Sequence, residues 1–316
     1  MRILYVNTPV YDFLTAAIIE GLNELASQMP IQLVTTRRSN YARASQVWTR
    51  QKIYKARHSF DLFILGTNDD VDEELYWDVA NPDHAICIDG SDYPTFMHPA
   101  EKFRLYFKRE LYESPIGNIR PCTFAIERRW WRPLSQNPAF FLAACFGPKT
   151  GDRARVIEFL EASKCCDVTI GPIKPTIWNS LEGVWRGQCS FSVWKKTPFA
   201  VGHNYRYYST LQKSLMALSV PGLGLDTGRY WEILGSGALL VSQTNSLQIL
   251  NRLVHGEHCF TFNSLDELAA ILQRARLDKN HVRVIRQQAR DLCLRYHSTL
   301  ARARYVIEEF RRTVVC

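Results

Sequence analysis

The chain has 316 residues, of which 46% are hydrophobic and 12% aromatic, and its formal net charge is +8. This length and composition allow two globular domains with buried cores and exclude a disordered chain. No apolar run of about 18 residues occurs, and no secretory leader precedes the first predicted strand, so we expect a cytoplasmic protein.

Apolar segments of strand length alternate with amphipathic segments in the first half of the chain. We predict strands at residues 2–7, 31–35, 62–65, 85–88, 104–108 and 122–126, and helices at residues 13–28 and 44–58. An acid-rich stretch around residues 69–74 is typical of a further helix start. Short strands that alternate with helices indicate a parallel sheet with helices on its faces.

A domain boundary is indicated where polar residues and prolines interrupt this alternation. Residues 128–138 contain Arg-Arg-Trp-Trp-Arg-Pro and Gln-Asn-Pro, after which the pattern restarts. In the second half we predict strands at residues 139–146, 167–170, 215–220 and 238–241, and helices at 153–162, 205–213, 264–275, 279–295 and 299–312. A further apolar helix is predicted just after residue 242.

The most informative segment is residues 222–232, Gly-Leu-Gly-Leu-Asp-Thr-Gly-Arg-Tyr-Trp-Glu, which joins an apolar strand to a helix. Arg229 and Glu232 are three residues apart and therefore share one helix face. Thr227 and Gly228 begin the helix, where N–H groups and the positive dipole favour a phosphate that a guanidinium can also bind. The alternative is a glycine-rich turn followed by an exposed ion pair.

The order of segments after this motif makes it more specific. A small-residue turn with a short apolar strand at residues 234–242, a His-Gly-Glu segment and an Asp-Glu-Leu helix follow in turn. This order resembles the C-terminal half of GT-B glycosyltransferases, especially the bacterial group 1 and spore-maturation-type proteins, over about residues 205–300. The resemblance implies that Glu232 holds the ribose of a nucleoside diphosphate sugar and that Arg229 faces its diphosphate.

The resemblance also implies the architecture. An α/β protein of GT-B type has two Rossmann-like domains whose parallel sheets face each other across a cleft. The expected units are an acceptor domain at residues 1–135, a nucleotide-sugar domain at 136–295 and a last helix at 296–316 that crosses back to the first domain. Ligands of such sheets bind at the carboxyl ends of the strands.

One departure from the family pattern concerns the donor sugar. Many retaining members carry a second Glu eight residues before the ribose-binding one, and Gly224 occupies that position here. Asp226 is the residue that can replace it. The identity of the sugar and the stereochemical course of the transfer therefore stay open.

The turn at residues 147–153 is a second candidate phosphate site. It combines two glycines with Lys149 and Arg153 at the junction of a predicted strand and helix, which suits a diphosphate. In GT-B enzymes this loop often lies opposite the Arg-Glu helix. An ordinary polar turn is the alternative.

Three carboxylates of the first half are candidates for catalysis. Asp12 follows the first strand, where GT-B proteins face the acceptor, and it could deprotonate a hydroxyl or cap the next helix. Asp89 and Asp92 follow the strand at residues 85–88 and could bind a sugar or act as a base. Asp and Gly also form turns for purely local reasons.

The positive charge is concentrated at the C-terminal end, since residues 274–316 hold 11 basic and 4 acidic side chains. A solvated helix face accounts for such a charge most simply. Peripheral binding to an anionic membrane surface is a second interpretation, and binding to nucleic acid is a third.

Taken together, these features predict a glycosyltransferase that moves a sugar from a nucleoside diphosphate sugar to a hydroxyl acceptor. A glycan, a lipid-linked saccharide or a modified nucleic acid base could supply the hydroxyl. Asp70-Val71-Asp72 matches a metal-binding Asp-x-Asp, but its surroundings favour the helix start, and we expect neither metal nor cofactor. The alternatives are a catalytically inactive nucleotide-sugar-binding protein and a sugar-nucleotide epimerase of the same plan.

Overall fold

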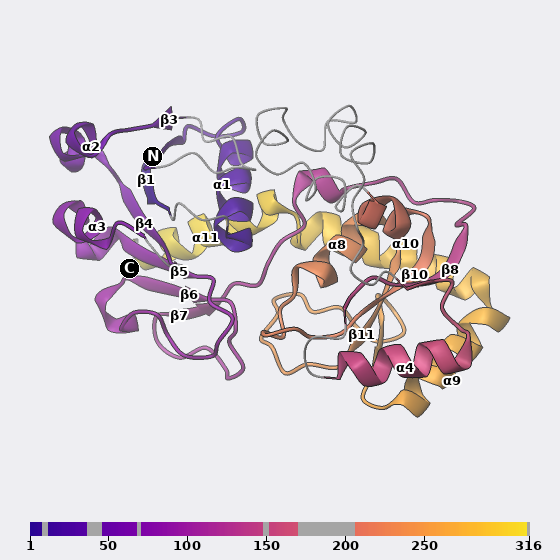
Figure 1. Cartoon of the computed structure of the whole chain (residues 1–316). Coiled ribbons are helices and arrows are strands. Elements are labelled where there is room, and N and C mark those ends of the chain that lie inside the picture. Colours follow the sequence, from indigo (N-terminus) through magenta and orange to yellow (C-terminus); the bar gives the residue numbers. More distant parts are fainter. Residues whose placement is uncertain (8–11, 37–45, 68–70, 148–151, 170–205, 315–316) are drawn as a thin grey trace.

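The structure is a computed structural model that describes residues 1–7, 12–36, 46–67, 71–147, 152–169 and 206–314. It contains two separate parallel sheets, each covered by helices (Figure 1). The first sheet has the spatial order β3 (Gln46–Val47), β2 (Gln32–Thr35), β1 (Arg2–Val6), β4 (Leu62–Thr67), β5 (Ala85–Asp89), β6 (Leu105–Lys108) and β7 (Ile119–Pro121). The predicted α/β architecture with parallel sheets is therefore confirmed.

Alternate residues of β1 pack on opposite faces of the first sheet. Ile3 and Tyr5 belong to the core shared with α1 (Phe13–Leu25), whereas Leu4 and Val6 pack with α2 (Arg50–Ala56) and α3 (Glu73–Val79). Strands that are buried on both faces need helices on both sides, and this is the arrangement observed. All four of these β1 residues are fully buried.

The second sheet has the order β12 (Phe260–Phe262), β11 (Leu239–Gln243), β10 (Ser214–Ser219), β8 (Phe140–Ala144) and β9 (Val168–Thr169). Its helices are a segment at residues 206–212, α4 (Arg153–Ser163), α8 (Gly228–Ser236), α9 (Leu265–Leu277) and α10 (Lys279–Tyr296). Residues 122–139, which we call the connecting segment, join β7 to β8. The predicted boundary after residue 135 falls in this segment.

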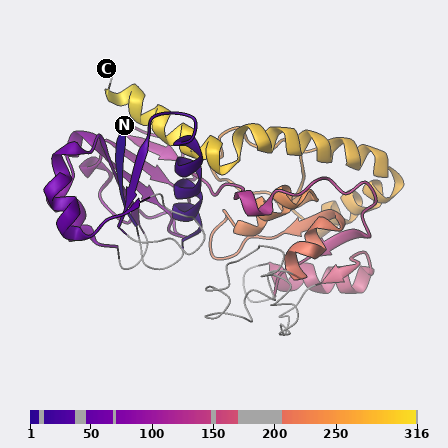
Figure 2. The ribbon, with the colours of Figure 1, turned by 90° about the horizontal axis from the view of Figure 1, so that it is seen from above.

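The last helix, α11 (Thr299–Val314), returns to the first sheet and lies beside α1 in both views of the ribbon (Figures 1 and 2). Gly21 of α1 makes this close approach possible, because a Cβ there would lie 2.8 Å from Ala303 Cβ. Arg120 Nε also donates to Glu309 Oε2 at 2.7 Å. No helix within the described ranges is long and apolar enough to cross a membrane.

The structure differs from the prediction where backbone groups find partners far away in the chain. Residues 122–126 form no continuous strand. Cys122 N still donates to the Lys108 carbonyl beside β6, whereas Ile126 N donates to the His297 carbonyl near the start of α11. The helix predicted over residues 44–58 begins only at Arg50. Its first turn is capped by Thr49, whose side chain accepts from Lys52 N.

The structure also differs from the prediction in the region after β11. Residues 244–254 contain no helix, although an apolar helix was expected there, and the backbone amide of Gln248 instead donates to the Leu111 carbonyl across the two halves. The short edge strand β12 was not predicted. Three residues are too few to show a hydrophobic period.

Candidate functional site

Residues that follow β6 meet the loop that follows β10 across the gap between the two sheets. Arg109 and Glu110 are 1% and 0% exposed. The Glu110 carboxylate accepts hydrogen bonds from the backbone N–H groups of Leu225 (3.0 Å) and Asp226 (2.9 Å), and Arg109 Nη1 donates to the Asp226 carbonyl (2.8 Å). The loop is therefore fixed to the first sheet just before α8 begins. We call Arg109, Glu110 and Asp226 the junction cluster.

Both carboxylate oxygens of Asp226 have structural partners. Oδ2 accepts from Phe124 N at 2.7 Å, and Oδ1 accepts from Trp231 Nε1 at 2.6 Å. Burial raises the pKa of Asp226 to about 6, and the nearby Arg109 charge opposes this rise. The expectation that Asp226 replaces a sugar-facing glutamate does not fit this geometry, because its oxygens hold the connecting segment and α8 together.

The junction cluster also explains why residue 224 is glycine. A Cβ at Gly224 would overlap Glu110 Oε1 and would lie 2.9 Å from Glu110 Cδ. A real Cβ essentially never approaches a carboxylate so closely, and Glu110 is held in place by two backbone amides. A glutamate from the other half of the chain thus occupies the space that a side chain at position 224 would need.

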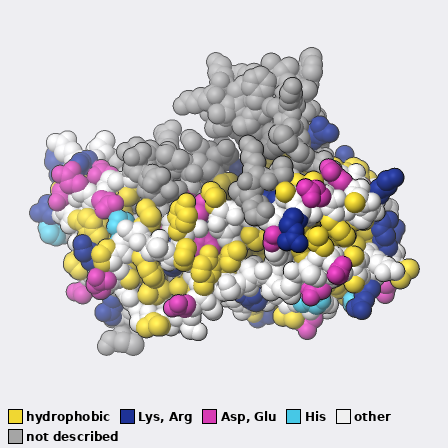
Figure 3. Space-filling model, turned by 60° about the horizontal axis from the view of Figure 1, so that its bottom comes forward, with side chains coloured by type: hydrophobic (Ala, Val, Ile, Leu, Met, Phe, Trp, Pro, Cys, Tyr) yellow, Lys and Arg dark blue, Asp and Glu magenta, His cyan; other side chains and the backbone are white. Residues whose placement is uncertain are grey.

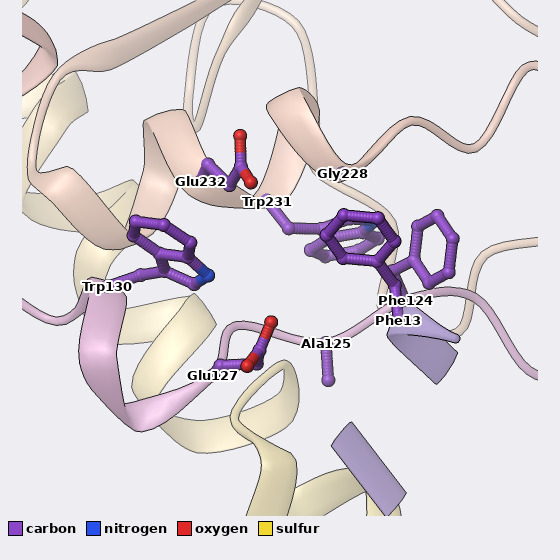
Figure 4. Close-up of a pocket in the computed structure, with 8 residues that line it drawn as sticks. All are labelled: Phe13, Phe124, Ala125, Glu127, Trp130, Gly228, Trp231 and Glu232. Atoms are coloured by element: carbon purple, nitrogen blue, oxygen red, sulfur yellow. The ribbon is translucent and has the colours of Figure 1, made fainter. Parts of the chain in front are cut away.

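A pocket lies between α8 and the connecting segment (Figure 4). Carboxylates and aromatic rings dominate its lining. The lining residues are Phe13, Phe124, Ala125, Glu127, Trp130, Gly228, Trp231 and Glu232. They come from the first turn of α1, the connecting segment and the first two turns of α8, so elements of both halves build the pocket.

Glu232 and Glu127 lie on opposite sides of this pocket (Figure 4). Tyr207 donates a hydrogen bond from its hydroxyl to Glu232 Oε2 at 2.7 Å. Burial raises the pKa of Glu232, while Tyr207 and Arg229 lower it and the charge of Glu127 raises it further. The structure therefore places the predicted ribose-binding carboxylate in a pocket, where it is close enough to a second carboxylate to feel its charge.

Arg229 and Arg153 form a pair of like charges at the carboxyl ends of β8 and β10. Both guanidinium groups lie over the Phe146 ring, at 5.3 Å and 6.0 Å from its centroid. Arg229 Nε donates to the Cys145 carbonyl (3.0 Å), and Arg153 Nη2 donates to the Val220 carbonyl (3.2 Å).

The two arginines lack an acidic partner within the described ranges of the chain. Neither guanidinium forms an ion pair there, and Arg229 Nη1 is buried without a hydrogen-bond acceptor. Burial lowers the pKa of Arg153, and the charge of Arg229 lowers it further. Two adjacent cations with unused donor capacity favour a bound anion.

The start of α8 adds backbone donors to the same place. Thr227 is the N-cap residue, but its side chain makes no capping hydrogen bond and instead contacts Ser219 Oγ at 3.2 Å. The amide groups at Gly228 and Arg229 begin a helix whose N-terminal end carries partial positive charge. Lys149, the other predicted phosphate-binding residue, lies outside the described residues.

The three candidate catalytic carboxylates lie along the carboxyl edge of the first sheet. Asp12 caps α1, since its Oδ2 accepts from Thr15 N at 2.7 Å, and burial raises its pKa. Asp92 is 47% exposed and pairs with Arg109 of the junction cluster. The structure therefore shows the capping role of Asp12. The Asp12 carboxylate also lies beside Gly90, at the edge of the first sheet that faces the second sheet.

Asp89 has a structural role instead of the catalytic role predicted for it. Its carboxylate is 0% exposed and accepts from Tyr106 Oη at 2.6 Å, and Lys108 Nζ lies 3.1 Å away. Its oxygens also accept from the backbone of Ser91 and Met97. A carboxylate that is enclosed by these partners holds the loop after β5, which fits the turn-forming alternative for Asp89.

Sequence reasoning gave no functional role to Glu127 or Arg129. Glu127 stands directly before the Arg-Arg-Trp-Trp run that was interpreted only as a boundary. A carboxylate next to aromatic residues in a connecting segment was the available signal. Within the described part of the chain, no group of three or more His, Cys, Asp or Glu side chains could hold a metal ion.

Part of the basic charge of residues 274–316 is buried. Arg286 and Arg302 are 3% and 2% exposed, and they donate to carbonyl groups of the connecting segment, Ser135 O at 3.0 Å and Phe124 O at 3.2 Å. Burial lowers the pKa of Arg286 to about 10. Figure 3 shows one face of the molecule, on which hydrophobic side chains gather and basic ones lie among acidic ones.

A family model described as glycosyl transferase-like matches residues 172–308, which include Arg229 and Glu232. No curated protein matches the chain in sequence. The match covers the part of the chain in which the order of motifs was informative.

Solved structures are similar to the chain over its whole length. An alpha-glucosyltransferase in complex with UDP-glucose and DNA containing an abasic site has a TM-score of 0.63 at 10% identity and covers 98% of both chains. A glycosyltransferase from Rickettsia africae ESF-5 has a TM-score of 0.62 at 10% identity, over 99% of this chain and 98% of that one. Anabaena Alr3699/HepE, in complex with UDP and glucose, has a TM-score of 0.59 at 10% identity, over 99% and 100%.

Proposed function

We propose that this chain, a glycosyltransferase of GT-B fold, transfers a sugar from a UDP-sugar to a hydroxyl acceptor without a metal ion. The family match and the two-sheet fold give the reaction class. The choice of UDP is supported by two solved structures of similar fold, one in complex with UDP-glucose and DNA and the other in complex with UDP and glucose. The proposal is carried by one observation, the pair formed by Arg153 at the start of α4 and Arg229 at the start of α8.

In this proposal the arginine pair and the α8 N-terminus bind the diphosphate. Two guanidinium groups without acidic partners in the described ranges, one of them with a buried and unused Nη1, supply donors and positive charge to phosphate oxygens. Glu232, one helical turn further along α8, accepts hydrogen bonds from ribose hydroxyls in the pocket. The nucleotide thus lies along the first two turns of one helix.

The transfer step needs charge stabilisation on the leaving group. The bond between the anomeric carbon and the diphosphate oxygen breaks, and its electron pair stays on the diphosphate. The acceptor oxygen forms the new bond to the anomeric carbon, and its proton leaves to a base. The arginine pair stabilises the growing negative charge. We propose Asp12 as the base, because its raised pKa and its position at the sheet edge suit a proton acceptor.

Donor binding is tested by thermal stabilisation with a panel of UDP-, GDP-, ADP- and dTDP-sugars, since a ligand that binds the folded state raises its melting temperature. We expect UDP-glucose to stabilise the protein. Glu232→Gln is expected to weaken UDP binding about tenfold to hundredfold, because it removes a charged acceptor. Glu161→Gln, on the exposed face of α4, is the control. Unchanged UDP affinity in Glu232→Gln would refute the ribose assignment.

Metal independence is tested directly with a chelator. Arg153 and Arg229 already provide two positive charges for the diphosphate, so we expect UDP-glucose turnover to be the same with and without EDTA. Activity that is lost in EDTA and restored by manganese or magnesium would contradict this proposal.

A further inference from the structure

The pocket of Figure 4 contains a carboxylate that the proposed function leaves without a role. Glu232 lies on the α8 side, and Glu127 lies on the side of the connecting segment. Glu127 directly precedes the turn Arg128–Trp130, and Arg128 N donates to Glu20 Oε1 on α1 at 2.7 Å. Glu127 is therefore fixed relative to the first sheet, whereas Glu232 belongs to the second.

Glu127 is paired with a cation at the pocket wall. Arg129 Nη2 donates to Glu127 Oε1 at 2.8 Å, and the Arg129 guanidinium lies 4.6 Å from the centroid of the Trp130 ring. An ionised carboxylate accepts at about four lone-pair sites, so it can bind a cation and a hydroxyl at the same time. Arg129 balances the charge of Glu127 at the pocket wall.

The chemistry of the pocket selects a hydroxyl-rich ring. Two carboxylates repel an anionic group and accept hydrogen bonds without donating any. Phe13, Trp130 and Trp231 offer aromatic surfaces to a ring.

We infer that Glu127 is a second nucleotide-binding residue, and that Glu127 and Glu232 accept hydrogen bonds from the two hydroxyl groups of one ribose ring. This inference rests on the proposed function, in which Glu232 holds the ribose. Gly228, at the helix start where the diphosphate binds, lines the same pocket and places this ring next to the phosphates. The ribose then joins α8 to the connecting segment, so nucleotide binding holds the two halves together.

The test measures the affinity of UDP, 2′-deoxy-UDP and 3′-deoxy-UDP by titration calorimetry for the full chain and its variants. In the unmodified protein, each deoxy analogue is expected to bind about tenfold to hundredfold more weakly than UDP. Glu127→Gln is expected to weaken UDP by a similar factor and to lose the discrimination against one analogue. Glu232→Gln is expected to lose the discrimination against the other. Glu113→Gln, an exposed acid outside the pocket, is the control.

Several outcomes would overturn the inference and leave the proposed function intact. Normal UDP affinity in Glu127→Gln, together with weak binding in Glu232→Gln, means that Glu127 does not touch the nucleotide. Equal weakening of UDP and both deoxy analogues means that Glu127 has only a structural role. Weakening of UDP-glucose but not of UDP means that Glu127 binds the transferred sugar. If Glu127→Gln fails to fold, Glu127→Asp replaces it in the same measurements. This variant keeps the negative charge that pairs with Arg129, but its shorter side chain withdraws the oxygens from the pocket.

A different pattern would show that the proposed function itself is wrong. If the unmodified protein does not bind UDP, or if UDP binds it normally and Glu232→Gln has no effect, the ribose is not at this pocket.

Discussion

Gly224→Glu is expected to weaken the contact between the two sheets instead of improving activity, although the family pattern has a glutamate at this position. The new side chain would overlap Glu110, whose carboxylate is 0% exposed and accepts from Leu225 N and Asp226 N. A second carboxylate there would be buried beside a like charge. We expect a loss of about 3–5 kcal/mol in the free energy of unfolding, measured by urea denaturation.

Smaller substitutions distinguish steric overlap from charge repulsion as the cause of the expected loss of stability. Gly224→Ala is expected to cost about 1–3 kcal/mol, because even a methyl group displaces Glu110. Combining it with Glu110→Ala should cost less than the sum of the two single changes. Gly147→Ala is the control, since a Cβ there meets no atom within 4 Å. A stable and more active Gly224→Glu protein would contradict the role given to the junction cluster.

Arg229→Ala and Arg153→Ala are each expected to reduce UDP affinity about tenfold to hundredfold, and the double variant should bind more weakly still. Each change removes a charged donor to a phosphate, worth roughly 1.5–3 kcal/mol. Turnover of UDP-glucose should fall at least as much as affinity, because the charge on the leaving diphosphate grows during transfer. Arg229→Lys should give an intermediate affinity, since lysine lacks the planar pair of donors.

The stability of the nucleotide-free protein distinguishes ligand binding from a structural role. The two guanidinium groups repel each other, so removing one should change the free energy of unfolding by less than about 1 kcal/mol. Arg155→Ala, on α4 and 74% exposed, controls for loss of charge on the same helix. If the loss in the free energy of unfolding of either variant were as large as its loss in the free energy of nucleotide binding, the arginine pair would have a structural role and not a binding role.

Local sequence was sufficient to predict the elements that carry the site. The segment at residues 222–232 has an apolar strand before it and a helix with a clear face after it, and β10 and α8 form as expected. The cap of α1 was one of the two roles considered for Asp12, and Asp12 caps α1, because a side-chain oxygen beside free backbone amides is a local preference.

Roles that depend on distant residues were not visible in the sequence. Glu110 binds amides that are 115 and 116 positions away, and Arg109 binds a carbonyl 117 positions away. The local sequence around Asp226 would be the same whether its carboxylate faced a sugar or the backbone of Phe124. Only the approach of the two sheets decides between these alternatives.

The amino-acid sequence by itself thus indicated the two parallel sheets and the helix that carries Arg229 and Glu232, because strand and helix periods and short motifs act within about ten residues. The expectation of sugar transfer came from the resemblance to GT-B glycosyltransferases. The tertiary structure alone decided which carboxylates line the pocket and which hold the backbone. It buried Asp89 and Asp226 in structural hydrogen bonds, brought Glu127 opposite Glu232, and required glycine at position 224. The physical reason is that burial and hydrogen-bond partners are properties of the packed chain, which no local pattern encodes.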